Sequence, residues 1–553
     1  MGMQRSATAS RRKFLGKAAA AAGALIGGVR LSYAQEKLEP GRPVPPLTFE
    51  HYSDEMRTQS VRIFAQELAK IGIRTTAVPL ATAAFLGKVY REHKLTLALG
   101  GYGGSLVRID PDFYLRSVYH SKGFMNASGY SNPEFDKVAE AQMRELDPAR
   151  RMRLIEEAQR IYARDLPSWW TIERSLINPV NTRHFRNFRP AKATGFEAYS
   201  IFPFMALEPT GSVRELNLAT FFKMSSGNLF SERAANGEAY LRFVYDTFLR
   251  YDENLNLVPA AAESYKVVDP VTFDLKIRDG MKWHDGKPVT AQDAKFTFDY
   301  LLKWKPPAWD VMVAPIKSAE LVNPSTVRVH LHAPSAIFVT VSLAQITILP
   351  EHIWKDVPEK HGVKRPEEWN MARGGTIGSG PFRFGSFQRD VDYHIVANRE
   401  YWGGRPKIDG IHYIQAANVE QLKGGMENET LHMVGDGLTL ADGKELEKKP
   451  YIKLFVVPHP SVQTFFLDMR KPLFQDPAVR HAMYYATPKS RILDVALAGG
   501  GSVARRTPLP PSYDQWIPKD IPGDEFNLDR ARKILADAGY TWDREGTLLM
   551  KKG

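Results

Sequence analysis

The stretch LKIRDGMKWHDGKPVTAQDAKFTFDYLL, Leu275–Leu302, combines short strand-like segments, two Asp-Gly pairs and a helical pattern. Asp-Gly is a dipeptide that tight turns prefer. The residues that follow have the pattern of a helix that begins near Thr290. Short strands that alternate with turns and close on a helix favour a mixed α/β fold.

A second mixed unit precedes this stretch. PLTFEHY at 46–52 and IRTTAVPL at 73–80 are strand-like, and the residues between them have the periodicity of a helix that Gly72 ends. Two more helices are predicted to start at Pro133 and Pro148. Strands and helices therefore alternate on both sides of the opening stretch.

The last residues of the chain contain a strand pattern without an obvious partner. Asn527 can cap a helix that Gly539 ends, and DREGTLLMKKG at 543–553 then reads as a turn followed by an apolar strand. We expect Thr547–Met550 to pair with Leu47–His51, far away in the sequence.

Composition favours a globular protein. The chain has 553 residues, of which 43% are hydrophobic and 25% charged, enough for two to four domains or large lobes. Its formal charge is +12, but residues 1–34 hold six Lys or Arg and no acid, which leaves +6 for the remainder. A net charge of +6 over the remaining residues is small and gives no indication of nucleic-acid binding.

The N-terminal segment has the pattern of an export signal. SATASRRKFLGKAAAAAGALIGGVRLSYAQE at 6–36 places Arg11 and Arg12 before a weakly apolar stretch that ends in small residues. The pattern resembles a twin-arginine signal peptide, and its apolar part is shorter than a membrane-spanning helix. The chain has no cysteine, so it can form neither disulfides nor a lipidated cysteine, and we expect a periplasmic protein.

Three segments resemble one known family in the same order. They are Val244–Leu302, which includes the opening stretch; GSGPFRF with NREYWGGRPKIDGI at 378–411; and DPAVRHAMYYATPKSRI through DRARKILADAGY at 476–540. They are similar to the family 5 extracytoplasmic solute-binding proteins, the peptide- and nickel-binding components of ABC importers. The resemblance implies a ligand held between two lobes and no catalytic activity.

The segments that this family places last stand first in this chain. SGYSNPEFDKVAEAQMRELDPARRMRLIEEAQRIYARDLP at 128–167 resembles the family's closing helices, and Leu47–Asp112 resembles the segment before them. We therefore expect a circularly permuted chain in which 206–211 joins the former ends. Permutation keeps the packing and changes only the connections.

The resemblance implies the two-lobed α/β fold of the type II periplasmic binding proteins, with mixed sheets and an interlobe cleft. The expected divisions are a signal peptide at 1–34, lobe II at 35–170 together with 463–553, and lobe I with its extra subdomain at 171–462. The two crossings between lobes should fall near Ser461–Leu467 and Leu166–Ile177.

The resemblance also places part of the ligand site in the glycine-rich loop before Asp110-Pro111. Peptide-binding members carry an acidic residue three positions before that pair, where this chain has Val107. Arg108 beside it would favour an anionic ligand group, or its side chain points to solvent. The predicted ligand contacts are Gly101, Tyr102, Arg108, Asp110, Trp169, Trp170, Arg174 and Ser226, with buried hinge packing as the alternative for the two tryptophans.

Other chemistries have weaker support. The chain lacks G-x-S-x-G and H-E-x-x-H motifs, LGGYGGS lacks the ending of a phosphate loop, and the pair His330 and His332 has no third metal ligand in view. NTRHFRNFRPAK at 181–192 is basic and aromatic, but an exposed charged face explains it better.

We therefore expect a monomeric periplasmic protein that captures a peptide or peptide-like solute for an ABC permease, with no cofactor, metal or nucleic acid. A secreted hydrolase or metal-dependent enzyme on a similar scaffold is the alternative.

Overall fold

The computed structural model describes residues 39–551 except 106–107, 198, 222–225, 227, 232–239, 370–375 and 390. The chain divides into two compact units, Met1–Glu39 and Pro40–Gly553. The expected signal peptide lies outside the described residues, and all that follows concerns the second unit.

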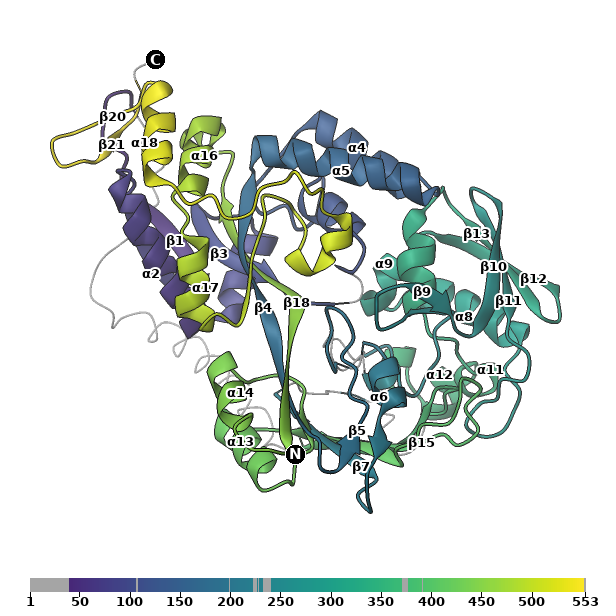
Figure 1. Ribbon diagram of the computed structural model, residues 1–553. Helices are drawn as coiled ribbons and strands as arrows, with labels where there is room; N and C mark the ends of the chain where they lie inside the picture. Colours follow the sequence, from purple (N-terminus) through teal and green to yellow (C-terminus); the bar gives the residue numbers. More distant parts are fainter. Residues whose placement is uncertain are drawn as a thin grey trace, which may run out of the picture. The chain divides into compact units, whose positions relative to one another are not determined.

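One large mixed sheet organises this unit (Figure 1). Its strands follow the order β14-β15-β16-β7-β17-β4-β18-β3-β1-β2, and β19 pairs with β4. In that order, their bounds are Phe382–Gln388, Asp392–Ala397, Gly410–Gln415, Glu215–Thr220, Met433–Val434, Ser168–Asn181, Ile452–Leu467, Leu97–Tyr102, Leu47–Tyr52 and Thr75–Leu80, with β19 at Gly501–Val503.

Two long strands join the two ends of the sheet. β4 and β18 have 14 and 16 residues and pair antiparallel from Ile452↔Asn181 to Phe466↔Ser168. One end of the pair contacts β3, and the other end contacts β17. We name the regions at these ends the β1 lobe (40–167 and 468–551) and the β7 lobe (182–451). The long strands occupy the segments where crossings were expected.

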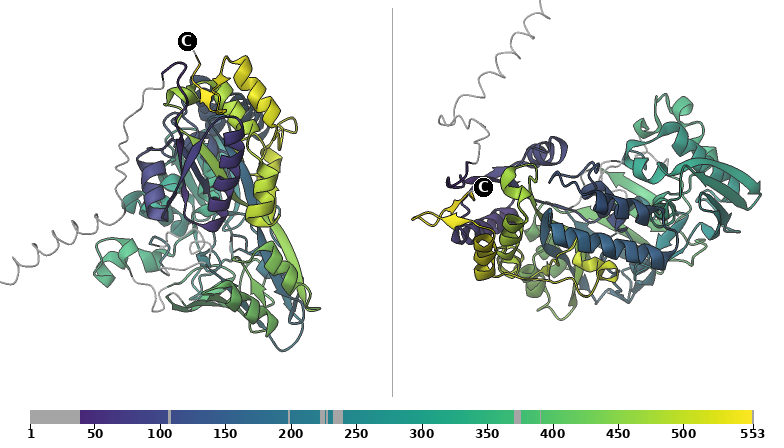
Figure 2. Two further views of the ribbon diagram at one scale, coloured as in Figure 1. Left: turned by 90° about the vertical axis from the view of Figure 1, so that its left-hand side faces the viewer. Right: turned by 90° about the horizontal axis from the view of Figure 1, so that it is seen from above.

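Helices with identifiable caps cover the β1 lobe. Asp54, Asn132 and Asp147 accept hydrogen bonds from the first turns of α2, α4 and α5, as side-chain caps do. Figure 2 shows α2 beside the β1–β3 strands, and the late helices of the chain complete the same lobe. The helical elements are α2 (Glu55–Lys70), α3 (Thr82–Phe85), η1 (Leu86–Arg91), η3 (Phe113–Val118), α4 (Pro133–Arg144), α5 (Pro148–Asp165), α15 (Pro472–Gln475), α16 (Pro477–Tyr485), α17 (Lys489–Leu497), η7 (Pro511–Trp516) and α18 (Leu528–Asp537).

The β7 lobe carries a second sheet. Its order is β10-β11-β13-β12, with bounds Ala262–Asp269, Thr272–Ile277, Thr326–Leu331 and Ile316–Asn323. The helix expected near Thr290 is α8 (Ala291–Trp304), which Thr290 and Asp293 cap and which packs on this sheet. The opening stretch of the sequence therefore builds a subdomain of β7-lobe residues.

Shorter elements complete the β7 lobe. The helical ones are α6 (Phe202–Ala206), η4 (Pro307–Trp309), α9 (Asp310–Val313), η5 (Phe338–Ser342), α10 (Leu343–Gln345), α11 (Glu351–Trp354), α12 (Val357–His361), η6 (Pro366–Glu368), α13 (Val419–Glu427) and α14 (Leu440–Leu446). The paired short strands are β5 (Phe185–Arg186) with β6 (Glu208–Pro209), and β8 (Leu249–Tyr251) with β9 (Leu257–Pro259).

The C-terminal strand pairs with the start of the described chain, but not with the predicted partner. β21 (Leu548–Leu549) forms a hairpin with β20 (Thr541–Trp542), and the Val44 amide donates to the Leu548 carbonyl at 2.8 Å. Leu47–His51 is unavailable because β2 and β3 occupy both edges of β1. The expected pairing with β1 was wrong; Gly41–Val44, just before β1, takes that place (Figures 1 and 2).

Candidate ligand-binding site

Gly101 and Tyr102 end β3 and lie against the long strand β18. A Cβ on Gly101 would stand 2.0 Å from the Val462 carbonyl oxygen, so only glycine permits this close strand contact. The Tyr90 hydroxyl bonds to the Gly101 amide and carbonyl. Tyr102 is buried, and its hydroxyl has no hydrogen-bond partner among the described residues.

The Arg108 guanidinium is held by its own loop. Its Nη1 donates to the Gly103 carbonyl at 2.5 Å, and its carbon lies 5.1 Å from the centre of the Phe113 ring. The side chain is therefore partly engaged instead of pointing freely to solvent. Val107 lies outside the described residues.

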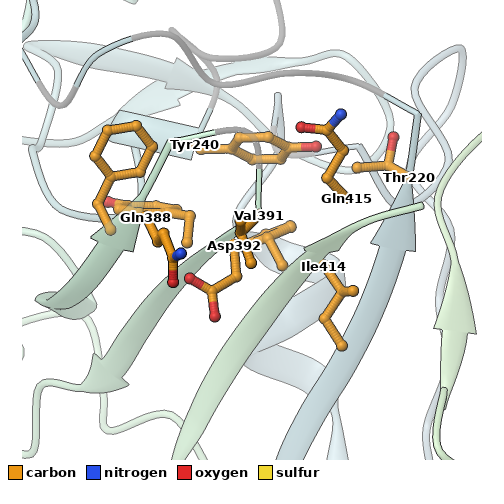
Figure 3. Close-up of a pocket in the computed structure, with 10 residues that line it drawn as sticks. Thr220, Tyr240, Gln388, Val391, Asp392, Ile414 and Gln415 are labelled. Carbon is orange, nitrogen blue, oxygen red and sulfur yellow. The ribbon is translucent and has the colours of Figure 1, made fainter. Parts of the chain in front are cut away.

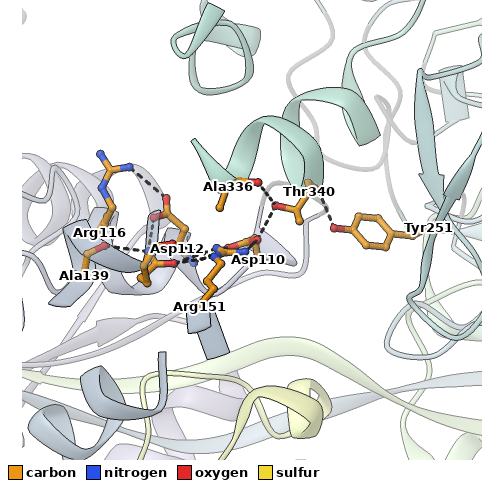
Figure 4. A network of polar contacts seen from close by, with 9 residues as sticks. Asp110, Asp112, Arg116, Ala139, Arg151, Tyr251, Ala336 and Thr340 are labelled. Atoms are coloured by element: carbon orange, nitrogen blue, oxygen red, sulfur yellow. Dashed lines mark hydrogen bonds and ion pairs between the residues drawn. The ribbon is translucent and has the colours of Figure 1, made fainter. Parts of the chain in front are cut away.

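Asp110 is the centre of a polar network (Figure 4). Its carboxylate accepts two hydrogen bonds from Arg151, at 2.5 and 2.9 Å, and both side chains are buried. Burial would raise the pKa of Asp110, but the Arg151 charge outweighs it and keeps that pKa below its ordinary value. The Thr340 hydroxyl, from the β7 lobe, donates to Asp110 at 2.7 Å. Asp110 thus joins the two lobes.

Trp169 and Trp170 are both fully buried beside the strand pair. The Trp169 ring packs on Phe465 and donates its N–H to Thr487, while Trp170 donates to the Tyr119 hydroxyl. These contacts give each indole a packing role within the β1 lobe. Ligand contact by either ring stays a prediction.

A group of charged side chains lies where the long strands pass into the β7 lobe. Arg174 on β4 forms a bidentate pair with Asp436 at 2.8 and 3.0 Å. His459 on β18 lies 3.1 Å from Glu197, and both are buried. Burial would raise the pKa of Asp436, but Arg174, with a smaller contribution from His459, lowers it. We call Arg174, Glu197, Asp436 and His459 the charged quartet.

A narrow pocket borders the quartet. It is lined from both lobes and from β18, by residues that include Gly104, Ser105, Thr194, Tyr199, His459 and Tyr513. The Nδ1 atom of His459 and the Thr194 hydroxyl are buried without partners among the described residues. Unsatisfied polar atoms beside a pocket are suited to hydrogen bonding with a ligand.

A second pocket lies at the carboxyl ends of β7 and β16. Figure 3 shows the Tyr240 ring beside Thr220 and Gln415 there. Burial raises the pKa of the Tyr240 phenol, and the negative charges of Glu197 and Asp436 add to the rise. The quartet is therefore within electrostatic range of both pockets.

Ser226 is in a turn of the β7 lobe. Its hydroxyl accepts from the Asn228 amide and from the Ser231 hydroxyl, a pattern typical of a polar turn. His330 lies 3.3 Å from Glu320 on the exposed face of the second sheet. Within the described ranges, no group of three metal-ligating side chains comes together, and no helix has the length and apolarity to cross a membrane.

Sequence reasoning identified Arg174 but missed its three partners in the quartet. Asp436 is 262 residues from Arg174, and Glu197 is equally far from His459. The Pro-His-Pro triplet at 458–460 was the available signal, because prolines within a strand mark irregular pairing, and the register of β18 with β4 shifts between Pro458 and Val462.

The sequence was then compared with known proteins. Residues 256–552 match the bacterial extracellular solute-binding proteins, family 5 Middle, and this match covers more than half of the chain. The chain belongs to the family 5 solute-binding proteins. It is 31% identical over 317 residues to the oligopeptide-binding protein AppA of Bacillus subtilis, with 56% of each chain covered.

A second relative has a different ligand in its name. The heme-binding protein A of Haemophilus influenzae is 26% identical over 320 residues, with 54% of this chain and 56% of that protein covered. The solved structure of Bacillus subtilis AppA with a nonapeptide is 26% identical, has a TM-score of 0.47, and covers 60% of this chain and 65% of that one. This chain spans about half the length of the curated relatives it matches.

The Asp436–Arg174 pair should stabilise the fold in a pH-dependent way. Asp436→Asn is expected to lower the free energy of unfolding by about 1–3 kcal/mol at pH 7, less than a fully buried pair because Arg174 is 29% exposed. The pKa of Asp436 is lower in the folded state, so the pair contributes above the ordinary pKa of aspartate, and the contribution disappears as the pH falls through the folded value.

Urea unfolding at pH 7 and at about pH 3 measures this difference. Asp520→Asn is the control, because its carboxylate is exposed and lies 3.5 Å from Arg160. Equal effects of the two substitutions at pH 7 would contradict a stabilising pair.

Proposed function

We propose that this protein is the periplasmic substrate-binding component of an ABC importer and that it captures a peptide or peptide-like solute. Family membership and the name of the oligopeptide-binding relative support this function. The observation that carries it is the charged quartet beside the pocket that residues of both lobes line. A monomer without cofactor or catalytic activity is part of the proposal, and a secreted hydrolase or metal-dependent enzyme on a similar scaffold is the alternative.

The Asp110–Thr340 contact supports capture by hinged closure of the two lobes. Asp110 and Arg151 belong to the β1 lobe, whereas Thr340 and Tyr251 belong to the β7 lobe, and the Tyr251 hydroxyl donates to the Thr340 carbonyl at 2.7 Å. A bond between lobes can form only while they are close. It therefore favours the closed state, which a bound solute would favour further.

Native mass spectrometry of the protein purified from periplasm should find a co-purified solute of peptide-like mass. Removal of that solute should increase the radius of gyration in small-angle scattering, and Thr340→Val should lower its affinity about 3–10-fold because one closed-state bond is lost. Thr541→Val, on the exposed hairpin, is the control. Hydrolysis of the solute, or identical scattering with and without it, would contradict the proposal.

We infer that the chain is a circular permutation of the family order. The order of the matching segments supports this, as do the hydrogen bonds between Gly41–Val44 and Leu548–Met550. The family match begins at residue 256, so residues 40–167 of the β1 lobe lie outside it. The proposed lobe divisions are those expected from the sequence, 35–170 with 463–553 and 171–462.

A rearranged gene that runs from Gly211 to Gly553 and continues from Glu36 to Pro209 should give a protein that folds and binds the same solute. Its packed contacts are retained, so we expect an unfolding midpoint within a few degrees of the original. A matched rearrangement opened between Gly424 and Gly425 interrupts α13 and should fold poorly. Insolubility of the first rearrangement alone would contradict the permutation.

We propose export by the twin-arginine pathway, supported by Arg11 and Arg12 and by the extracellular description of the family. Replacement of both residues by lysine should leave the precursor in the cytoplasm, which cell fractionation and immunoblotting would detect. A variant in which Lys13 and Lys17 are replaced by arginine is the control and should not impair export. Normal periplasmic delivery of the double lysine variant would contradict this pathway.

A further inference from the structure

The direction of the Glu173 side chain depends on an irregularity in the pairing of β4 with β18. Val462 pairs with Glu173 and Thr464 with Trp170, so two steps along β18 oppose three along β4. This is a β-bulge, and it changes which face the following side chains point to. Glu173 and Trp170 consequently lie on the same face of the sheet, as do Val462 and Thr464.

The Glu173 carboxylate is only half satisfied. Its Oε1 accepts from the Ser512 amide at 3.1 Å and from the Ser512 hydroxyl at 2.6 Å. Its Oε2 is buried and has no hydrogen-bond partner within the described part of the chain, where Glu173 also forms no ion pair. A buried carboxyl oxygen without a hydrogen-bond partner is costly in either protonation state and requires an explanation.

Other unsatisfied polar atoms belong to residues near Glu173 in the strand register: Tyr102 pairs with Val462, the residue opposite Glu173, and Thr464 pairs with Trp170. The hydroxyls of Tyr102, Tyr114 and Thr464 are buried and without partners among the described residues. Tyr114 is within electrostatic range of Glu173 and Arg108, and Tyr513 is within range of the same two charges. Tyr513 follows Ser512 and lines the pocket beside Gly104, so the carboxylate is connected to that pocket through two neighbouring residues.

We propose that Glu173 binds a cationic group of the solute, an ammonium or guanidinium, through Oε2. The phenol and threonine oxygens can accept the remaining N–H groups of such a cation. This inference rests on the proposed function and identifies the chemical class of the ligand group. The acidic residue that binds the cation would then lie on the long strand β4 and not in the glycine-rich loop, where the Arg108 guanidinium donates to the Gly103 carbonyl.

Binding of a cation at Glu173 should release a proton. Burial raises the pKa of Glu173 to about 8; hydrogen bonds from Ser512 oppose the rise, and the Asp514 charge adds to it. The other ionisable groups that face this region are Arg108, Tyr114 and Tyr513. At pH 7 the unoccupied carboxyl group is therefore mostly protonated. Its proton passes to the buffer when the carboxylate pairs with a cation.

Isothermal titration calorimetry of the whole protein at pH 7 with three tripeptides tests this inference. The probes are trialanine, N-acetyl-trialanine and N-acetyl-Ala-Lys-Ala, which carry a main-chain cation, no cation and a side-chain cation. At least one cationic peptide should bind ten-fold or more tightly than N-acetyl-trialanine, and the tighter one identifies the source of the cation. In phosphate and Tris buffers, its binding enthalpy should differ by the release of nearly one proton.

Glu173→Gln keeps the acceptor for Ser512 and should weaken the cationic peptide ten-fold or more, change N-acetyl-trialanine less than two-fold and abolish the proton release. Asp514→Asn, an exposed neighbour paired with Lys192, is the control and should change affinity less than two-fold. Circular dichroism and thermal melting establish that both variants fold.

Equal affinity of the three peptides for the wild type would overturn the role of Glu173 and leave the proposed function intact. Unchanged affinity of Glu173→Gln for the cationic peptide would also overturn the role of Glu173, and it would indicate that a structural water bonds to Oε2. Failure of the wild type to bind any of the three would instead count against a peptide solute, and the inference would fall with it.

Discussion

The antiparallel pairing of β4 with β18 is the constraint on which the rest of the structure depends. Backbone pairing from Ile452↔Asn181 to Phe466↔Ser168 carries both strands from one lobe to the other. The pair also carries side chains of both lobes: Trp169 and Phe465 at one end, Ile177 and Ile452 at the other. A change in its register would displace the two hydrophobic cores together.

The polar groups at the junction fall into two classes. The Asp110–Arg151 pair is buried and fully engaged, so it fixes geometry. In the charged quartet the Nδ1 atom of His459 has no hydrogen-bond partner among the described residues, and neither has Oε2 of Glu173. Burying such atoms costs free energy, so they mark the positions where a further hydrogen bond would be most favourable. Polar groups that stabilise the fold and polar atoms that lack a partner therefore lie within one region, at the junction of the two lobes.

Local signals in the sequence predicted local structure well. The helices expected at Pro133, at Pro148 and near Thr290 are present as α4, α5 and α8. The long strands lie where the family resemblance, not a local signal, placed the crossings. Contacts between distant residues were less accessible. The bulge that aims Glu173 depends on the register between β4 and β18, and the Asp436–Arg174 pair joins residues far apart, so neither has a local signature. The partner of Leu548 was misassigned by a few residues because the occupied edges of β1 could not be seen in the sequence.

The pairing of Gly41–Val44 with Leu548–Met550 has a consequence for biosynthesis. The β1 lobe is assembled from segments that the ribosome makes at opposite times, whereas the β7 lobe is continuous and can fold while synthesis proceeds. Strands β1–β3 therefore emerge with an incomplete core and wait for α16–α18 and the final hairpin. Closing so long a loop is slow, and the exposed strands are the part of the nascent chain most in need of a chaperone.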